Sequence, residues 1–439
     1  MRIIAALCLL SLACCAQPFE HIVIVVQENR SVDNLFGSNP TFEPGVDIAV
    51  SGQTSQGLTV PLTPAPLASC FGPSHTHNAF LIQFNKGAMD GFDKLKTAGC
   101  AAGAYPLYRY VDNSTGTVQP YFDLATGYGC ANRMFQSNQG PSFPAHQFLI
   151  SGSSAPDDNS DLFAANNPTI NFAGCASPAS ATVPMIDPNG IYSLLYPCFN
   201  LSTLPDLFEA SGLTWHYYAV SAKSMWAAPS AISHLCNAQM LGGELKCSGA
   251  EWENVTLKPA TFLTDIGNCK LANVTWVTPT GQNSDHSQTN RGGGPSWVAS
   301  IVNAIGSSSC GYWQNTAIII TWDDWGGWYD HVPPAKIIQS GWGKGYVYGF
   351  RVPLLVVSAY TPASYVSNSN HDFGSILRFV ENNFSLGLIG PGIWADSYAD
   401  DLGDFFAPGP PKAFTAIRAP LGPEYFLNDA EPASDPDDD

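Results

Sequence analysis

The sequence predicts an α/β fold of three layers, an α/β/α sandwich in which helices cover both faces of a mostly parallel central sheet. Short β-branched runs at residues 21–26, 317–321 and 352–358 have the continuous apolar character of strands buried on both faces. Residues 296–305 and 373–383 place apolar side chains three and four apart, as helices do. Strands that alternate with helices are typical of a layered α/β domain.

The N-terminus predicts export. Met1-Arg2 precedes a short apolar run with small residues up to Ala16, which is typical of a secretory signal and shorter than the ~20 residues that span a bilayer. We expect residues 1–16 to be cleaved, leaving a secreted or periplasmic protein without a stable transmembrane anchor. A buried first strand and lipidation at Cys14 or Cys15 are the alternatives.

The rest of the chain predicts one catalytic domain at residues 17–426. Of 439 residues, 45% are hydrophobic, which is enough for a sizeable core. Residues 38–74 and 153–180 are rich in Pro, Gly, Ser, Thr and Asn and predict long surface excursions. Residues 427–439 form an acidic tail that we expect to be disordered.

The charge balance argues against nucleic acid as a partner. Asp and Glu outnumber Lys and Arg by 36 to 18, whereas a duplex binder needs a basic stripe. The net charge of -18 also repels anionic substrates at long range. Any phosphate site must therefore create its own positive field, from a metal ion or from backbone N–H groups.

Cysteine usage predicts disulfides. Removal of the first 16 residues leaves nine of the twelve cysteines, without the close pairs of a zinc site. An exported chain reaches an oxidising compartment, where several would pair. Because nine is odd, at least one cysteine stays unpaired.

Two acidic segments follow predicted strands directly. Glu28-Asn29 comes after residues 21–26, and Asp323-Asp324 comes after residues 317–321. In open α/β sheets ligands bind at the carboxyl ends of strands, and carboxylate with amide oxygens suits a hard divalent cation. The alternatives are that Asn29 or Ser31 only caps the next helix, and that the two aspartates lie in a solvated turn.

Ser142 is the candidate nucleophile. Pro141 and Pro144 flank it, which suits a loop that enters a helix, where free N–H groups and the helix dipole attract an anion. Such a serine is either a simple N-cap or a nucleophile that a metal ion activates, and spacing alone does not decide between them.

Six of the nine histidines lie in polar, Gly-rich or strand-end segments, where they could ligate a metal, hold phosphoryl oxygens or protonate a leaving group. They are His75, His77, His146, His286, His331 and His371. His286 and His371 have a neighbouring aspartate that could bias their charge, so they are the preferred candidates.

Taken together, six segments resemble the bacterial phosphoesterase family of non-haemolytic phospholipases C and acid phosphatases. They lie at residues 21–37, 85–92, 140–144, 319–331, 349–354 and 371–376. The resemblance implies an alkaline-phosphatase-like fold with one divalent metal ion. It also implies that the metal ligands are Glu28, Asn29, Ser142, Asp323 and Asp324, and that Ser142 is the nucleophile. Pocket residues by position would be His75, Asp90, His286 and His371.

The resemblance is incomplete in one segment. Family members usually carry a histidine and a tryptophan where this chain has Leu81 and Phe84, so one pocket contact is expected to be absent. The short C-terminal part places the chain closer to the compact acid phosphatases than to phospholipases with further β domains.

The sequence thus predicts an exported, metal-dependent phosphoric ester hydrolase that forms a phosphoserine at Ser142. A metal-binding surface protein without activity and a sulfate ester hydrolase on the same fold are the alternatives. Oxygen ligands with histidine accept calcium, magnesium, manganese or zinc, so the metal is not identified. The substrate is expected to be a phosphate monoester or a phospholipid head group.

Overall fold

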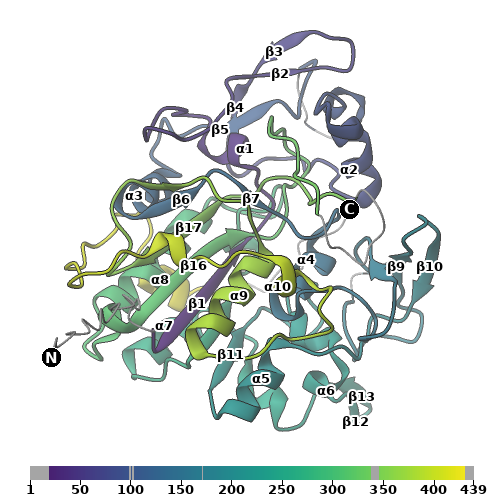
Figure 1. Ribbon diagram of the computed structural model, residues 1–439, viewed down its shortest axis with the longest axis vertical. Helices are drawn as coiled ribbons and strands as arrows, with labels where there is room; N and C mark the ends of the chain where they lie inside the picture. The colour runs from purple at the N-terminus through teal and green to yellow at the C-terminus, as the bar shows by residue number, and fades with distance from the viewer. Residues whose placement is uncertain (1–18, 98–99, 101–102, 171, 338–345, 431–439) are drawn as a thin grey trace, which may run out of the picture.

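The computed structural model describes residues 19–97, 100, 103–170, 172–337 and 346–430 (Figure 1). The predicted signal peptide therefore lies outside the described residues, as does most of the predicted acidic tail. The tail's first residues are described, and the last helix runs into them, to Leu427. Asp429 then accepts a hydrogen bond from Asn283 at 3.1 Å.

Within the described residues, eight strands form the central sheet. In spatial order they are β14 (Val255–Thr256), β11 (Trp215–Tyr218), β15 (Val274–Val277), β1 (His21–Gln27), β16 (Thr316–Trp322), β17 (Leu354–Ser358), β6 (Gly129–Ala131) and β18 (Tyr365–Ser367). The first five run parallel to one another, and β6 and β18 are also parallel. The predicted α/β class with a mostly parallel sheet is confirmed.

Strand β17 departs from the expected direction. It lies antiparallel to both neighbours, β16 and β6. Thr321 at the end of β16 pairs with Leu354 at the start of β17, so the chain leaves and re-enters the sheet at the same edge. A parallel neighbour would need a crossover to the opposite edge, which this connection does not make.

The helices form two groups, with the sheet between them (Figure 1). One group comprises α3 (Gln119–Gly127), α7 (Thr261–Gly267), α8 (Gly294–Gly306) and α11 (Pro423–Leu427). The other comprises α4 (Ser142–Ser151), α5 (Leu204–Ser211), α9 (Phe373–Phe384) and α10 (Ala395–Tyr398). The predicted helices at residues 296–305 and 373–383 correspond to α8 and α9, so both predictions are confirmed.

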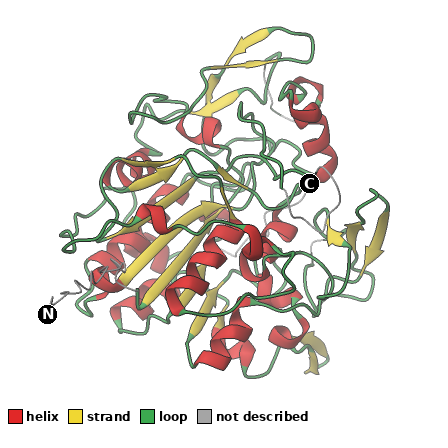
Figure 2. Cartoon of the chain, in the orientation of Figure 1, coloured by secondary structure: helices red, strands yellow, loops and turns green. Residues whose placement is uncertain are grey.

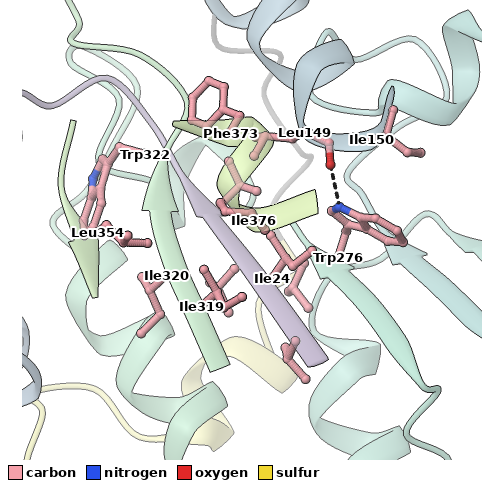
Figure 3. Packing of buried hydrophobic residues seen from close by; sticks show 14 of the residues in the cluster. Ile24, Leu149, Ile150, Trp276, Ile319, Ile320, Trp322, Leu354, Phe373 and Ile376 are labelled. Atoms are coloured by element: carbon pink, nitrogen blue, oxygen red, sulfur yellow. Dashed lines mark hydrogen bonds between the residues drawn. The ribbon is translucent and has the colours of Figure 1, made fainter. Parts of the chain in front are cut away.

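The core lies on both faces of this sheet. Residues 22–26 of β1 are fully buried, as a strand covered by helices on both sides must be. Figure 3 shows Ile24 of β1, Trp276 of β15 and Ile376 of α9 in this core, where the Trp276 indole N–H donates to the carbonyl of Leu149 in α4. Burying each such side chain contributes roughly 1.5–3 kcal/mol, so the central strands anchor the loops at their ends.

Short elements and long loops lie outside the sheet (Figure 2). These short elements are α1 (Val32–Phe36), β2 (Ser51–Gln53), β3 (Thr59–Pro61), β4 (Thr63–Ala65), α2 (His77–Phe84), β5 (Arg109–Val111), β7 (Met134–Phe135), β8 (Phe163–Ala164), β9 (Val183–Ile186), β10 (Tyr192–Leu195), α6 (Ser233–Cys236), β12 (Gln239–Leu241), β13 (Glu244–Lys246) and β19 (His371–Asp372).

The two predicted surface excursions are more buried than expected. Val60, Leu62 and Phe71 of the first enter a second apolar cluster with Trp325 and Trp328. In the second excursion, the described residues at 163–165 enter the main core. Apolar residues between the Gly and Pro turns explain this, because a composition rich in turn residues still leaves enough apolar area to bury.

Four disulfides join eight of the nine cysteines beyond the signal. The pairs are Cys70–Cys100, Cys175–Cys198, Cys236–Cys247 and Cys269–Cys310. Among the described residues Cys130 is the free cysteine that the odd count requires. It is buried. Disulfides are typical of oxidising, extracytoplasmic compartments. None of the helices in the described ranges has the length and apolar character needed to cross a membrane.

Candidate active site

The two acidic segments leave the sheet side by side. β1 and β16 are parallel neighbours, and their last residues, Gln27 and Trp322, pair with each other. Glu28-Asn29 and Asp323-Asp324 follow these positions directly, and all four residues are almost fully buried. The Asp323 N–H donates to the carbonyl of Gln27 at 2.9 Å, which extends the strand contact into the loops.

The two loops also touch through Asn29. Its backbone N–H donates to Asp323 Oδ1 at 3.0 Å, and its φ of 63° is left-handed, which is uncommon for a residue with a side chain. A Cβ at Gly326 would lie 2.3 Å from the Asn29 carbonyl oxygen, so only glycine fits there. Asn29 is therefore held against the Asp323 loop and does not cap α1; Ser31 does, accepting from the Asn34 N–H.

Ser142 is brought to the same place by α4. It is the first residue of this helix, and its hydroxyl donates to Asp324 Oδ2 at 3.4 Å. The N-terminal N–H groups of a helix attract anions, so the serine lies where a phosphoryl group would be stabilised. His77, another of the candidate histidines, supports the preceding loop, because its Nδ1 lies 2.8 Å from the Gln139 carbonyl.

His146 was one of the six candidate histidines, but it was not among the preferred candidates or the implied metal ligands. It follows Ser142 by one helical turn, a spacing that places both on one face of α4. Its Nε2 lies 3.2 Å from Glu28 Oε1 and 3.9 Å from Asp323 Oδ2. In the sequence, the four-residue spacing between Ser142 and His146 was the signal that could have placed His146 in this site.

The protons on His146 can be assigned. Burial raises the pKa of the Tyr217 hydroxyl, which stays protonated and donates to the Trp226 carbonyl at 2.8 Å. His146 Nδ1, 3.5 Å from the Tyr217 oxygen, must then be the donor in that contact. His146 therefore faces Glu28 and Asp323 either as an imidazolium or with a bare Nε2 that can ligate a cation.

The residues present fit a metal ion. Glu28, His146 and Asp323 offer ligand atoms that all lie within 4.8 Å of one another. Across the described residues, buried Asp323 Oδ2 and Asn29 Oδ1 have no hydrogen-bond partner. Buried polar atoms left unsatisfied are costly, and a cation would satisfy both. Carboxylate, amide and imidazole ligands are those of hard and borderline divalent ions.

His75 and His286 lie on one side of this group. His75 Nδ1 is 3.0 Å from the Pro73 carbonyl and so carries the proton, while Nε2 accepts from the Asn29 amide at 3.1 Å. That contact turns the Asn29 amide oxygen away from His75. The His286 ring centre lies 6.1 Å from that of His75, so both imidazoles line the same space.

Aspartates beside the preferred histidines do not pair with them. The Asp285 carboxylate accepts from Tyr121 at 2.8 Å and from Trp322 at 3.0 Å instead of facing His286, and burial raises its pKa to about 6. Asp372 caps α9 by accepting from the Ser375 N–H at 3.1 Å. Burial raises the pKa of Asp372 to about 7, while its hydrogen bonds and the charge of His371 oppose that rise. The expected charge coupling is therefore present between His371 and Asp372 without a hydrogen bond, and at His286 it stays a prediction.

Asp90 and His371 make their contacts elsewhere. Asp90 Oδ1 accepts from the Asn85 amide at 2.6 Å. His371 Nε2 lies 3.0 Å from Ser367 Oγ and 3.6 Å from Asp404. In the described part of the chain, none of these contacts links Asp90 or His371 to Ser142, so their pocket roles stay predictions.

Leu81 and Phe84, which stand where family members usually carry histidine and tryptophan, do not provide polar contacts to the site. Leu81 is exposed, and Phe84 stacks on Phe80 with ring centres 5.4 Å apart. Phe80 in turn lies against Trp325, whose indole N–H donates to Gln83 at 2.7 Å. An aromatic layer therefore supports the Asp323-Asp324 loop.

Known proteins are similar in sequence to this chain over most of its length. The phosphoesterase family profile matches residues 19–387. Phospholipase C A of Mycobacterium tuberculosis is 23% identical over 433 residues, covering 88% of this chain and 77% of the relative. Hemolytic phospholipase C of Pseudomonas aeruginosa is 24% identical, covering 89% of this chain but 56% of the relative.

Solved structures are similar at lower identity. A protein of the alkaline phosphatase superfamily from Vibrio parahaemolyticus is 9% identical with a TM-score of 0.35, covering 84% of this chain and 68% of that one. A phosphonate monoester hydrolase from Silicibacter pomeroyi is 10% identical with a TM-score of 0.34, covering 68% and 73%. On the extent of the family match, the chain belongs to the phosphoesterase family and is a hydrolase that acts on phosphoric ester bonds.

Proposed function

We propose that this hydrolase is exported, depends on one divalent metal ion and acts through a phosphoserine at Ser142. One observation carries the proposal: Ser142, at the N-terminus of α4, donates to Asp324, and buried oxygens of Asn29 and Asp323 nearby in the same loops lack hydrogen-bond partners. A serine that only capped a helix would not need a hydrogen bond to a buried carboxylate. The cleavable signal at residues 1–16 stays a prediction, and the four disulfides support export.

The chain's own groups have distinct proposed tasks. The ion would be held by oxygens of Glu28, Asn29, Asp323, Asp324 and Ser142. His146 would either orient the Glu28 carboxylate or act as a further ligand beside it. When bound, the ion supplies positive charge that lowers the serine's pKa and neutralises phosphoryl oxygens.

In the first step the Ser142 oxygen attacks phosphorus while its proton passes to Asp324. The bond from phosphorus to the leaving oxygen breaks, and His286 gives that oxygen a proton. N–H groups at the start of α4 stabilise the charge on the phosphoryl oxygens. Water then attacks phosphorus and gives a proton to His286, the serine–phosphorus bond breaks, and the Ser142 oxygen regains its proton from Asp324.

Substitution of Ser142 by alanine tests the nucleophile. We expect turnover of p-nitrophenyl phosphate to fall by on the order of 10⁴-fold or more, as when other covalent nucleophiles are removed. Acid-quenched wild-type enzyme should carry phosphate on the peptide that contains Ser142. The matched control is Ser151→Ala at the other end of α4, where the hydroxyl donates only to backbone carbonyls, of Gln147 and Ser153. Near-native turnover by the Ser142 variant would refute the assignment.

Substrate size is tested separately. The names of the relatives, which are phospholipases C, support a phospholipid substrate, and a small monoester is the other predicted substrate. Rates on p-nitrophenyl phosphate and on phosphatidylcholine vesicles, after chelation and metal add-back, distinguish the two. Equal loss on both substrates in Ser142→Ala would show that one site serves them.

A further inference from the structure

Arg351 lies in a segment, residues 349–354, that matched the family but has no role in the chemistry above. Its side chain is fully buried. Nε lies 3.1 and 3.2 Å from the two Asp330 oxygens, and Nη2 donates to Asp33 Oδ1 at 3.0 Å. Nη1 donates to the carbonyls of Asp47 and Asn132 at 2.8 and 3.1 Å. A guanidinium with this many bonds is fixed in place.

The two aspartates belong to the two loops that carry the candidate metal ligands. Asp33 is in α1, just after Glu28-Asn29, and Asp330 lies in the loop that begins with Asp323. They are also joined directly, because the Asp33 N–H donates to Asp330 Oδ2 at 3.2 Å. Arg351 thus joins these two loops from a third segment.

The backbone around Arg351 pairs with the strand that leads to Ser142. Arg351 forms a β-bridge with Phe135 of β7, and the Val352 N–H donates to the Met134 carbonyl at 2.9 Å. A Cβ at Gly349 would lie 2.0 Å from the Asn138 carbonyl oxygen, so this approach requires glycine. Residues 134–138, which lead to Ser142, are therefore held against the segment that contains Arg351.

We propose that Arg351 is a positioning residue that holds the loops of Asn29, Asp323 and Ser142 in the geometry that binds the metal. The inference rests on the proposed function. Arg351 touches neither the ligands nor Ser142, and it acts through Asp33, Asp330 and its own backbone.

A second metal ion at this place is the competing explanation. Asp33, Asp330 and His331 do offer ligand atoms within 4.8 Å of one another. Their carboxylate oxygens, however, already accept from Arg351, from the His331 ring at 2.8 Å and from backbone N–H groups of residues 33, 49, 331 and 332. The guanidinium supplies the positive charge that a cation would otherwise provide.

The experiment compares Arg351→Met, Arg351→Lys and Arg133→Met in the full-length protein. Chelator-treated samples are titrated with calcium, magnesium, manganese and zinc in turn, and kcat and KM are measured with the ion that restores turnover. For Arg351→Met we expect about 10–100-fold weaker metal binding, as for other residues that orient ligands. We expect kcat to fall about 100-fold with KM nearly unchanged. Lysine should rescue only in part, because it lacks the guanidinium's fork of donors.

Arg133→Met is the matched control. Arg133 donates to Asp47 Oδ2 at 2.6 Å, next to the network, but contacts neither Asp33 nor Asp330. We expect native metal affinity and turnover. If Arg351→Met is folded and lowers only the melting temperature, with native metal affinity and kcat, the positioning role is wrong. An extra equivalent of metal bound by wild type and lost from this variant would instead show a second ion.

Asp330→Asn keeps the inference testable if Arg351→Met does not fold. It preserves the shape of the side chain and removes one charge, so we expect a smaller loss of metal affinity, about tenfold. No loss would overturn the proposal. If wild type binds metal but hydrolyses no phosphoric ester, the proposed function fails, while the metal titrations still decide the role of Arg351.

Discussion

Two buried groups of carboxylates and histidine follow the same pair of strands, yet they differ in how their charge is balanced. Around Ser142, Asp323 Oδ2 and Asn29 Oδ1 lack hydrogen-bond partners among the described residues. In the group of Asp33, Asp330 and His331, Arg351 and backbone N–H groups fill the carboxylate oxygens. Buried carboxylates need a partner charge, so the group with unsatisfied oxygens is the one suited to an external ion.

Among substitutions of acidic residues in the two groups, the largest effect should come from Asp323→Asn. Loss of one ligand removes several kcal/mol of charge stabilisation, so we expect turnover to fall by at least about 10³-fold. Stability of the metal-free protein should not fall, because asparagine Oδ1 can still accept from the Asn29 and Asp324 N–H groups. Turnover assays and urea denaturation in chelator check both. Retained metal-dependent turnover would erase the distinction between the two groups.

The same substitution in the other group, Asp330→Asn, should affect stability first. It leaves Arg351 with one carboxylate in a fully buried position, and breaking such a pair costs about 3 kcal/mol. Burial raises the pKa of Asp330 to about 6 even though the charge of Arg351 opposes this, so urea denaturation belongs at pH 8, where the carboxylate is ionised. Equal stability losses in both asparagine variants would contradict the comparison.

A smaller, pH-dependent effect is expected from His331→Gln. Burial lowers the pKa of His331, but the hydrogen bond and charge of Asp33 outweigh it and raise the pKa to about 9. Because the folded pKa exceeds the unfolded value, the stabilisation is complete below about pH 6.5 and is lost as pH rises through 9. Allowing for partial exposure, we expect the variant to be about 1 kcal/mol less stable at pH 6 and equal at pH 10. A difference independent of pH would exclude the ion pair.

The residues that follow strands could be predicted from the sequence. Continuous apolar runs mark β1 and β16, and polar residues directly after such runs lie at the ligand-binding edge of the sheet. Glu28, Asn29, Asp323 and Asp324 were found in this way. The odd cysteine count likewise required a free thiol, which is Cys130.

Residues whose roles depend on strand order could not be predicted. The runs do not say that β1 and β16 are neighbours, nor that β17 is antiparallel, because both depend on how the intervening segments pack. Arg351 shares the buried apolar surroundings of β17, so only its contacts with Asp33 and Asp330 reveal a function. His146 was one candidate among six, and its distance from Glu28 singles it out.

The left-handed Asn29 against Gly326 limits how this centre could be transferred to another protein. The approach of 2.3 Å between the Asn29 oxygen and a would-be Cβ means that neither loop keeps its shape without the other. A graft onto a new scaffold would have to carry both loops as one unit, together with the stretch around residue 351. Natural variation should follow the same rule, with insertions tolerated between these segments and rarely inside them.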